Sequence, residues 1–485
     1  MKYSRIIFAL IALLNVSFIS PCDDGDFVEI DESPAGGAGS TPVFISYSPV
    51  FQGNLFAAVA AFGGTISEYT VNQTTGAFAL AAGFPLSVPY TPSEVVYSPV
   101  YNNTLYLAVS DASSGNIYVY TVNATNGALT PVPDSPFLTP YGGGANAIAF
   151  SPVIDNNLYF AAVGEGATGA NNGPLSMYQV DPFTNNLTFL ATYPAPSSPH
   201  VTDTFIDVTF SPVFQGTLAL FAFDATAATI NSYSVNSSTG ALTLLTELFD
   251  LDVSSIACSP LINSNTFPIL AAARLGDDNI SSYIVNMDSA SPDFGFLTLN
   301  NTLSTGFEPE QVSFSPIAGG LLFVATPNAA SDSISVFQIN TNTSSPEFGF
   351  LEFIQTLGTL SVPVSLAFSP FVQNYLFAAD VGVEQTYVDI YQVTLLVPII
   401  TTVSTTVRCG CQISIQATII GGTPPYTVVW SDGLTQIVSG NTFTRTVTAN
   451  TTTTYTIVQV TDANGCVAGP SNSVTIGVFC PCSCG

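Results

Sequence analysis

A short phrase that recurs seven times is the sequence feature that most constrains the fold. It consists of an aromatic or small residue, then Ser-Pro, then an aliphatic or aromatic residue. The seven pairs are Ser48-Pro49, Ser98-Pro99, Ser151-Pro152, Ser211-Pro212, Ser259-Pro260, Ser315-Pro316 and Ser369-Pro370. Their prolines lie 50, 53, 60, 48, 56 and 54 residues apart. Repeats of this length predict an array or propeller rather than an ordinary globular domain.

Each repeat has the pattern of four antiparallel strands. The segment ahead of Ser-Pro, such as Val43–Tyr47, reads as a strand, and a turn leads into a second, continuously apolar strand that is buried on both faces. A third strand alternates, as in Ile66–Val71, and ends in a turn such as Asn72–Gly76, whose residues tolerate a left-handed backbone. A short fourth strand follows. Seven such units predict an all-β fold with a seven-bladed β-propeller.

The seventh repeat lacks a fourth strand. After its third strand, Val388–Thr394, the chain continues into Leu395-Leu396-Val397-Pro398 without a hairpin turn. An open edge would leave backbone groups unpaired. Asp26–Ile30, ahead of the first repeat, alternates as a strand does, so we expect it to close the ring as the outer strand of blade seven.

The composition changes near Pro398 to Thr, Val and Ile. Six strand-like runs, separated by turns rich in Gly, Pro and Asp, predict a C-terminal Ig-like β-sandwich. The runs are Ile399–Val407, Gln412–Ile420, Tyr426–Trp430, Thr442–Thr448, Thr454–Val460 and Ser473–Val478. Trp430, the only tryptophan, is expected in the core of this module rather than in a ligand site.

Two segments carry a resemblance to known families. Ser211-Pro212, the following aliphatic strand, Ser232–Asn236 and Thr239–Thr243 resemble the YVTN and lactonase-like seven-bladed propellers, over residues 43 to 394. This resemblance implies the propeller fold; enzymes of the family open phosphorylated sugar lactones. In the C-terminal module, Gly421–Tyr426 and Thr461–Cys466 resemble PKD-like and SprB-type repeats, which implies a spacer or adhesive module.

These features divide the chain into five parts. Residues 1–21 are expected to form a signal peptide, because Lys2 and Arg5 precede an apolar run. Residues 22–42 form an N-terminal segment with the ring-closing strand, and residues 43–395 form the propeller. Residues 396–479 form the sandwich, and residues 480–485 a Cys-rich tail. We therefore expect an extracellular or cell-surface protein whose mature chain has no membrane span.

The charge balance limits the partners of the chain. Five Lys and Arg residues stand against 33 Asp and Glu residues, which gives a formal net charge of −28. Such a surface cannot neutralise phosphates, so nucleic acid is excluded as a partner. The propeller repeats contain only Arg274 and His200 as basic residues, too few for the anionic substrate of lactonases of the family, so the sequence argues against lactonase activity.

Eight cysteines in an exported chain point to disulfides. Cys258 replaces an aromatic residue of its repeat and is expected to be a free core cysteine. The tail spacing does not match zinc sites, which favours disulfides over metal. The disulfide candidates are Cys22, Cys409, Cys411, Cys466, Cys480, Cys482 and Cys484, and Cys22 could bond to the tail of a neighbouring subunit.

No catalytic or metal-binding pattern stands out. His200, in a loop, is the only histidine for Ser-His-Asp chemistry and is more often a solvated turn residue. Carboxylates cluster at residues 23–26, 250–252 and 277–278, so calcium is left open, although none has the pattern of a calcium loop. We expect no catalytic residue, no resident metal and no other cofactor.

Glycosylation sequons are numerous, although a chain rich in Ser and Thr produces many by chance. Those in the outer hairpin turns would be accessible to a transferase. The candidates are Asn72, Asn102, Asn123, Asn186, Asn236, Asn279, Asn300, Asn342 and Asn450.

Taken together, these patterns predict an exported, non-enzymatic structural or adhesive surface protein. Self-association into an oligomer or a glycosylated, head-to-tail filament would follow from cysteines at opposite ends, with glycans as further partners. The alternative is a lactonase-like enzyme, or a binder of small ligands or carbohydrates, that uses the central funnel of the propeller.

Overall fold

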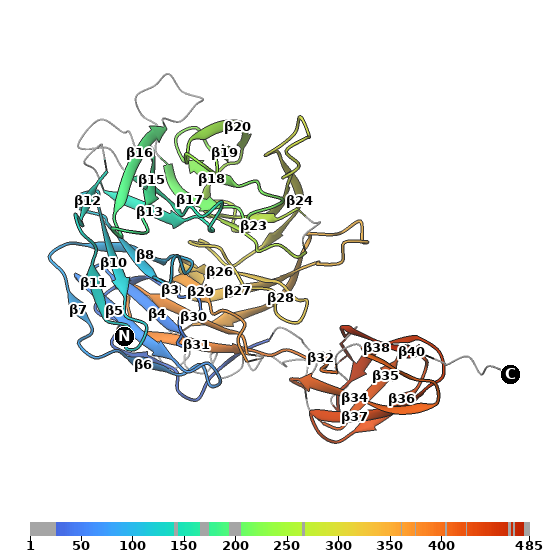
Figure 1. The fold of residues 1–485 in the computed structure, drawn as a ribbon. Helices are drawn as coiled ribbons and strands as arrows, with labels where there is room; N and C mark the ends of the chain where they lie inside the picture. Colours follow the sequence, from blue (N-terminus) through green and yellow to red (C-terminus); the bar gives the residue numbers. More distant parts are fainter. Residues whose placement is uncertain are drawn as a thin grey trace. The chain divides into compact units, whose positions relative to one another are not determined.

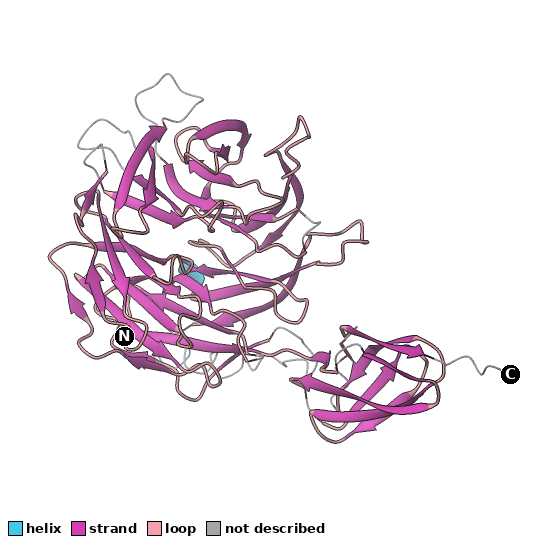
Figure 2. Ribbon diagram, in the orientation of Figure 1, coloured by secondary structure: helices cyan, strands magenta, loops and turns pink. Residues whose placement is uncertain are grey.

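The computed structural model describes residues 26–139, 144–164, 174–193, 205–263, 267–359, 361–373, 375–402, 405–422, 424–463, 467–468 and 471–479. The predicted signal peptide, His200 and the Cys-rich tail lie outside them. Strands dominate the described chain (Figures 1 and 2). One compact unit spans Phe27–Val393, and a second contains the described residues from Thr394 onward together with Asp26.

The first unit is a seven-bladed β-propeller, as the Ser-Pro spacing predicts (Figure 1). Each blade is an antiparallel sheet, and its inner strand contacts the inner strands of the two neighbouring blades, which closes a ring. The inner strands are β3 (Pro42–Tyr47), β8 (Pro92–Tyr97), β13 (Ala145–Phe150), β17 (Phe205–Phe210), β21 (Val253–Cys258), β25 (Ser313–Phe314) and β29 (Pro363–Phe368).

The two middle strands of each blade are almost wholly buried between neighbouring blades. The second strands are β4 (Phe56–Ala61), β9 (Tyr106–Asp111), β14 (Tyr159–Gly164), β18 (Ala219–Asp224), β22 (Ile269–Arg274), β26 (Phe323–Asn328) and β30 (Phe377–Gly382). The third strands are β5 (Thr65–Val71), β10 (Asn116–Val122), β15 (Leu175–Val180), β19 (Thr229–Val235), β23 (Asn279–Val285), β27 (Ser333–Ile339) and β31 (Tyr387–Val393).

The outer strands differ between blades. In blades three to six they are continuous: β16 (Leu187–Tyr193), β20 (Leu242–Phe249), β24 (Leu297–Ser304) and β28 (Leu351–Gly358). In blades one, two and seven they come as two short pieces: β6 (Phe78–Leu80) and β7 (Leu86–Ser87), β11 (Leu129–Pro131) and β12 (Phe137–Leu138), β1 (Phe27–Glu29) and β2 (Ala35–Gly36). A cis X-Pro bond separates the two pieces each time, a feature that the sequence analysis missed.

The buried serine of each Ser-Pro pair explains why the phrase recurs. The Ser48 hydroxyl accepts a 2.9 Å hydrogen bond from the Phe56 amide at the start of the second strand. The same bond, 2.9–3.0 Å long, forms in the six other blades. Pro has no amide proton, and the turn that follows contains left-handed residues such as Gln52 and Gly53. Ser-Pro therefore ties the first two strands of every blade together.

The ring closes through pairing of segments from opposite ends of the propeller unit. Phe27, Val28 and Glu29 of β1 lie opposite Val393, Gln392 and Tyr391 of β31, antiparallel, and β2 pairs with the other end of β31. Phe27 is 4% exposed, and its ring packs edge-on to Phe368 with the centroids 5.7 Å apart. The N-terminal segment thus supplies the outer strand that the seventh repeat lacks.

The second unit contains two sheets around one core centred on Trp430, which is 1% exposed as expected. One sheet contains β32 (Val397–Ile400), β34 (Cys411–Ile420) and β37 (Thr442–Ala449). The other contains β33 (Thr405–Arg408), β40 (Ser473–Phe479), β38 (Thr453–Thr461), β35 (Tyr426–Trp430), β36 (Thr435–Val438) and β39 (Val467–Ala468). The Ig-like and SprB-type assignments stay predictions.

Two details of this unit differ from the expectation. The predicted strand at 399–407 is two strands, β32 and β33, in different sheets, and β36 was not predicted. Among the described residues no helix is long and apolar enough to cross a bilayer; the helix present is a single 3-10 turn, η1 (Ala329–Ser331).

Replacing a Ser-Pro serine should destabilise the propeller. Ser315→Ala removes the acceptor of the buried Phe323 amide, and an unsatisfied buried donor costs about 1–3 kcal/mol. The free energy of unfolding in urea measures this loss. Ser289→Ala, at an exposed serine, is the control and should leave it unchanged.

Ring closure can be tested on one strand with two substitutions. Phe27→Ala should lower the free energy of unfolding by about 3 kcal/mol, because it empties a buried site at the closing strand. Val28→Ala is the matched control, since Val28 is 50% exposed, and should cost well under half as much. Equal effects of the two substitutions would show that β1 does not close the ring in solution.

Candidate functional site

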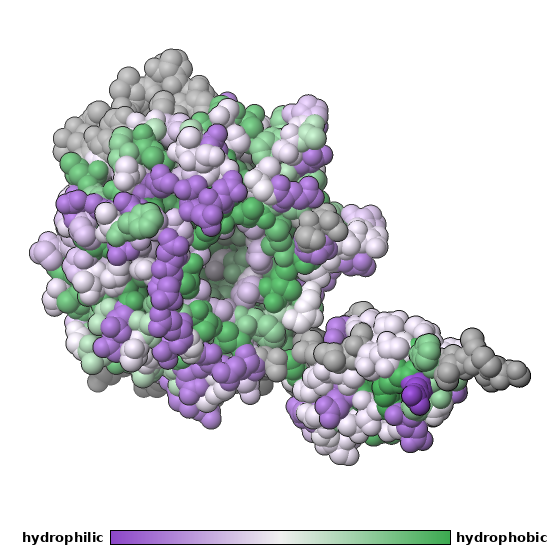
Figure 3. Space-filling model, viewed as in Figure 1, coloured by the Kyte–Doolittle hydropathy of each residue, from purple (hydrophilic) through white to green (hydrophobic). Residues whose placement is uncertain are grey.

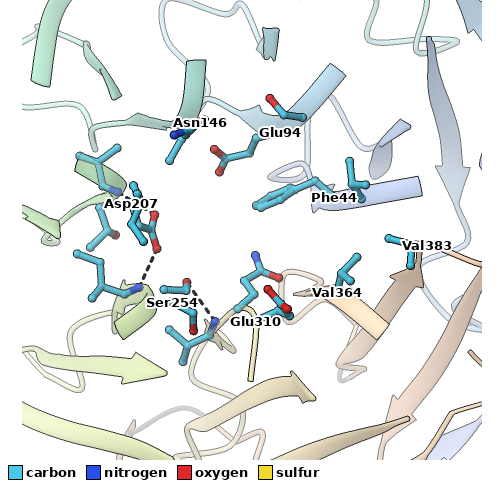
Figure 4. A pocket seen from close by; sticks show the side chains of 18 of the residues that line it. Phe44, Glu94, Asn146, Asp207, Ser254, Glu310, Val364 and Val383 are labelled. Atoms are coloured by element: carbon cyan, nitrogen blue, oxygen red, sulfur yellow. Dashed lines mark hydrogen bonds between the residues drawn. The ribbon is translucent and has the colours of Figure 1, made fainter. Parts of the chain in front are cut away.

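A cavity of about 420 Å³ lies at the centre of the propeller, where the inner strands of the blades meet. Figure 3 shows the hollow in the face of the propeller, and Figure 4 shows the side chains around it. The lining residues come mainly from two successive positions in each inner strand, the fifth and the fourth residue before the Ser-Pro serine. We call this cavity the funnel.

A β-bulge explains why two successive side chains face the funnel. In β13, Ala145 pairs with Gly164 and Ala147 with the adjacent Val163, so Asn146 is an extra residue. The register shifts at the corresponding place in β3, β8, β17, β21 and β29. Bulges re-aim side chains, and they are frequent next to active sites.

The second of the two positions links neighbouring blades. The Glu94 carboxylate (Oε2) accepts a 2.7 Å hydrogen bond from the Ile148 amide of the next blade, and Asp207 (Oδ2) accepts an equal one from Ile256. The corresponding acceptors in blades five, six and seven are Ser255, Gln311 and Ser365. These side chains therefore hold the inner ring together.

The first of the two positions offers groups to a ligand. Ser93 and Ser254 donate to backbone carbonyls of the next blade. By contrast, the side chains of Asn146 and Glu310 make no hydrogen bond to another described residue, and both line the funnel (Figure 4). An amide and a carboxyl group are thus free to bind a molecule in the funnel.

The funnel carboxyl groups have raised pKa values. Burial raises the pKa of Glu94 well above its ordinary value, the charge of Asp207 raises it further, and the bond from Ile148 opposes the shift. Burial raises the pKa of Asp207 to about 6, although hydrogen bonds to its carboxylate, including one from the Ile256 amide, act to lower it. Burial, and then the charge of Glu308, raise the pKa of Glu310. Carboxyl groups with shifted pKa values in a cleft are typical of functional sites.

Among the described residues, none of those that line the funnel is basic. Arg274, one of the two basic residues of the propeller repeats, pairs with Asp250 and Asp277, each at 3.0 Å. His200 lies outside the described residues. The sequence analysis did not single out Glu310, Asn146 or the two carboxyl groups of the inner ring, which line the cavity, and the expectation of no catalytic residue stays a prediction. Their common distance from Ser-Pro is the sequence signal that could have found them.

The other predicted sites are spread over the molecule. Cys258, Cys409 and Cys411 form no disulfide with another described residue, and Cys22, Cys466, Cys480, Cys482 and Cys484 lie outside the described residues. Most sequon asparagines are exposed, including Asn72, Asn123 and Asn236, whose side chains accept hydrogen bonds from the following turn. Disulfide formation, glycosylation and export stay predictions.

In the described part of the chain, no group of three or more Asp, Glu, His or Cys side chains is placed to hold a metal ion. Asp250 and Asp277 are partners of Arg274 rather than free ligands.

The fold and the funnel define the class of protein, a seven-bladed propeller with an acidic central site. No family profile and no curated protein matches the sequence. A provisionally assigned 6-phosphogluconolactonase from Bacteroides uniformis is similar in structure, with 18% identity and a TM-score of 0.50 over 66% of this chain and 86% of that one. This likeness shows the fold.

Two further solved structures are similar at lower scores. A protein from Lactobacillus plantarum has 18% identity and a TM-score of 0.46, over 67% of this chain and 86% of that one. The Cps50 (Swd1) propeller domain of Myceliophteria thermophila has 13% identity and a TM-score of 0.49, over 77% of this chain and all of that one.

The predicted non-enzymatic structural or adhesive role is contradicted. Its premise was that the side chains needed for chemistry are nearly absent, but three carboxyl groups with raised pKa values line one cavity. The structural likeness also includes a lactonase-like propeller. The alternative that uses the funnel fits these findings better, and the prediction that the chain is not an enzyme loses its basis.

Substitutions at Glu94 should separate the effect of its charge on stability from the effect of its hydrogen bond. A carboxyl group whose pKa is higher in the folded protein than in the unfolded chain makes stability fall as pH rises from about 4 through the folded pKa. Glu94→Gln keeps an acceptor for Ile148 and should reduce this fall. Glu94→Ala should be less stable than Glu94→Gln by about 1–3 kcal/mol at pH 8.

Urea unfolding of the wild type and both variants between pH 5 and pH 8 measures these differences. An unchanged pH slope in Glu94→Gln would contradict the assigned pKa direction.

Proposed function

We propose that this protein is a hydrolase that opens an uncharged lactone in the central funnel, with Glu310 as the general base. The observation that carries the proposal is the Glu310 carboxyl group, which lines the funnel without a hydrogen-bond partner among the described residues. Its pKa is raised, which makes it a stronger base than an ordinary carboxylate. The funnel volume of about 420 Å³ suits a small molecule.

The reaction needs only water and the lactone. Ionised Glu310 takes a proton from a water molecule as its oxygen bonds to the lactone carbonyl carbon. The bond from that carbon to the ring oxygen then breaks, and protonated Glu310 returns the proton to the leaving alkoxide. The free Asn146 amide is a donor for the carbonyl oxygen as negative charge develops on it.

The charge of the funnel argues for a substrate without phosphate. Glu94, Asp207 and Glu310 line the cavity, and the part of the chain that the structure describes adds no basic residue to it. The lactone is uncharged, whereas the product is a carboxylate at neutral pH. With its pKa of about 6, Asp207 is mostly ionised there, so its charge repels the product and favours release.

Binding without catalysis is a second candidate function. Asn146 and Ser254 place polar groups in the funnel, and Phe44 adds apolar surface (Figure 4). Gln311 and Phe62 also line it. Polar groups next to aromatic rings are typical of sites that bind sugars and other polyols. Such a binder would hold the lactone or its parent sugar and leave the ring intact.

Glu310→Gln tests the catalytic role. We expect the full chain to hydrolyse glucono-δ-lactone, and the variant to lose at least about 100-fold in kcat with little change in KM, because the base is removed but the shape is kept. Glu352→Gln, at an exposed carboxyl group on β28, is the matched control and should retain full activity.

The wild-type rate should rise with pH through a value above the ordinary glutamate pKa, because Glu310 must be ionised. The phosphorylated lactone should react more slowly than the uncharged one. Saturable lactone binding with no hydrolysis above the spontaneous rate would favour the binder, and neither binding nor hydrolysis would refute use of the funnel.

A further inference from the structure

A second group of acidic side chains lies away from the funnel, in the blade that closes the ring. Asp380 of β30 is fully buried and lies directly opposite Asp389 of β31, which is 6% exposed. Gln385, in the turn between these strands, is 3% exposed. We call Asp380, Asp389 and Gln385 the seam cluster, because β31 also pairs with the closing strand β1.

Three oxygens of the seam cluster lack a hydrogen-bond donor of normal geometry. Neither carboxylate oxygen of Asp380 has a hydrogen bond of normal geometry. Burial raises the pKa of Asp380, and the nearby Tyr391 hydroxyl lowers it by a smaller amount. The Gln385 amide nitrogen donates to Asp389 at 3.3 Å and also to Ser361. The Gln385 carbonyl oxygen is left without a partner. Three buried oxygens are therefore unsatisfied.

Within the described ranges, no positive side chain compensates the two carboxyl groups. The strands of blades six and seven, together with β1 and β2, contain no Lys, Arg or His. Besides the cluster, their titratable residues are Glu29, Glu352, Tyr387 and Tyr391, and Glu384 is exposed in the turn. Blade one, which packs on the other face, adds Tyr47, Glu68 and Tyr69. Of the described arginines, Arg274 and Arg445 pair with other aspartates, and Arg408 lies in the second unit.

Two buried carboxylates without a counter-charge, one of them also without a hydrogen bond of normal geometry, are very costly. A proton shared between Asp380 and Asp389 would remove one charge and join one pair of oxygens, but it would leave the Gln385 carbonyl unsatisfied. A hard cation removes both charges and takes carboxylate and amide oxygens as ligands. It therefore accounts for all three unsatisfied oxygens.

We propose that the seam cluster binds a hard divalent cation of the calcium type. Two carboxylates and one amide oxygen form its protein ligands, so the site differs from clusters of three or more acidic residues. Because Asp389 lies on the strand that pairs with both β30 and β1, the ion stabilises the blade at which the ring closes.

Thermal unfolding of the full chain at pH 8 tests the proposal. Calcium should raise the Tm in a saturable manner, by roughly 5 °C or more over protein in EDTA. Asp380→Asn and Asp389→Asn should each abolish the calcium-dependent rise. Glu352→Gln, on the outer strand of the neighbouring blade, is the control and should keep it.

The pH dependence distinguishes the ion from a shared proton. Burial raises the pKa of Asp380 and of Asp389, so without an ion stability should fall as pH rises from about 4 through the folded pKa values. Saturating calcium should abolish most of this fall. Terbium gives a direct readout, because Tyr391 near Asp380 should sensitise its emission, and Asp380→Asn should remove the signal.

Two results would overturn the proposal. One is a calcium effect that persists in the Asp380→Asn/Asp389→Asn double variant, which would place the ion elsewhere. The other is the absence of any calcium effect together with the same pH-dependent fall in stability, which would identify a shared proton. If the variants fail to fold, terbium emission of the wild type and its displacement by calcium still decide whether an ion binds near a tyrosine.

Discussion

The hydrogen bond from the second strand of each blade to the Ser-Pro hydroxyl is the contact on which the propeller depends. It forms in all seven blades at 2.9–3.0 Å, and every serine involved is at most 1% exposed. This hydrogen bond fixes where the inner strand ends. It thereby places the fifth and fourth residues before the serine at the propeller axis. The repeat that defines the architecture therefore also sets the position of the funnel.

Much of this architecture could be predicted from local patterns. Ser-Pro spacing, turn residues such as Gly76 and Gly240 with positive φ, and the missing fourth strand of the seventh repeat are all local signals. The broken outer strands and the strand β36 were missed, because short exposed pieces have little hydrophobic pattern. Residues 399–407 were interpreted as one strand because they form a continuous run rich in Ile, Val and Thr, yet β32 and β33 join different sheets.

The funnel was harder to predict, because its residues differ from blade to blade. At the fifth position before the serine the seven residues are Val43, Ser93, Asn146, Ile206, Ser254, Glu310 and Val364. Each looks like an ordinary strand residue in its own repeat, and only the circular arrangement brings Asn146 and Glu310 to one cavity. An overall shortage of basic residues was interpreted as a lack of chemistry, but carboxyl groups in a buried setting supply acid and base functions without them.

Pairing of β1 with β31 has a consequence for biosynthesis. Strand β1 must remain without its partner until more than 350 further residues have been translated, since β31 ends at Val393. Six blades can form in succession as they leave the ribosome. The seventh blade completes the wall around the central cavity, and it requires β31 to pair with β1, which was translated before all the blades. A ribosome stalled before β31 would thus release a product with folded blades and no finished site.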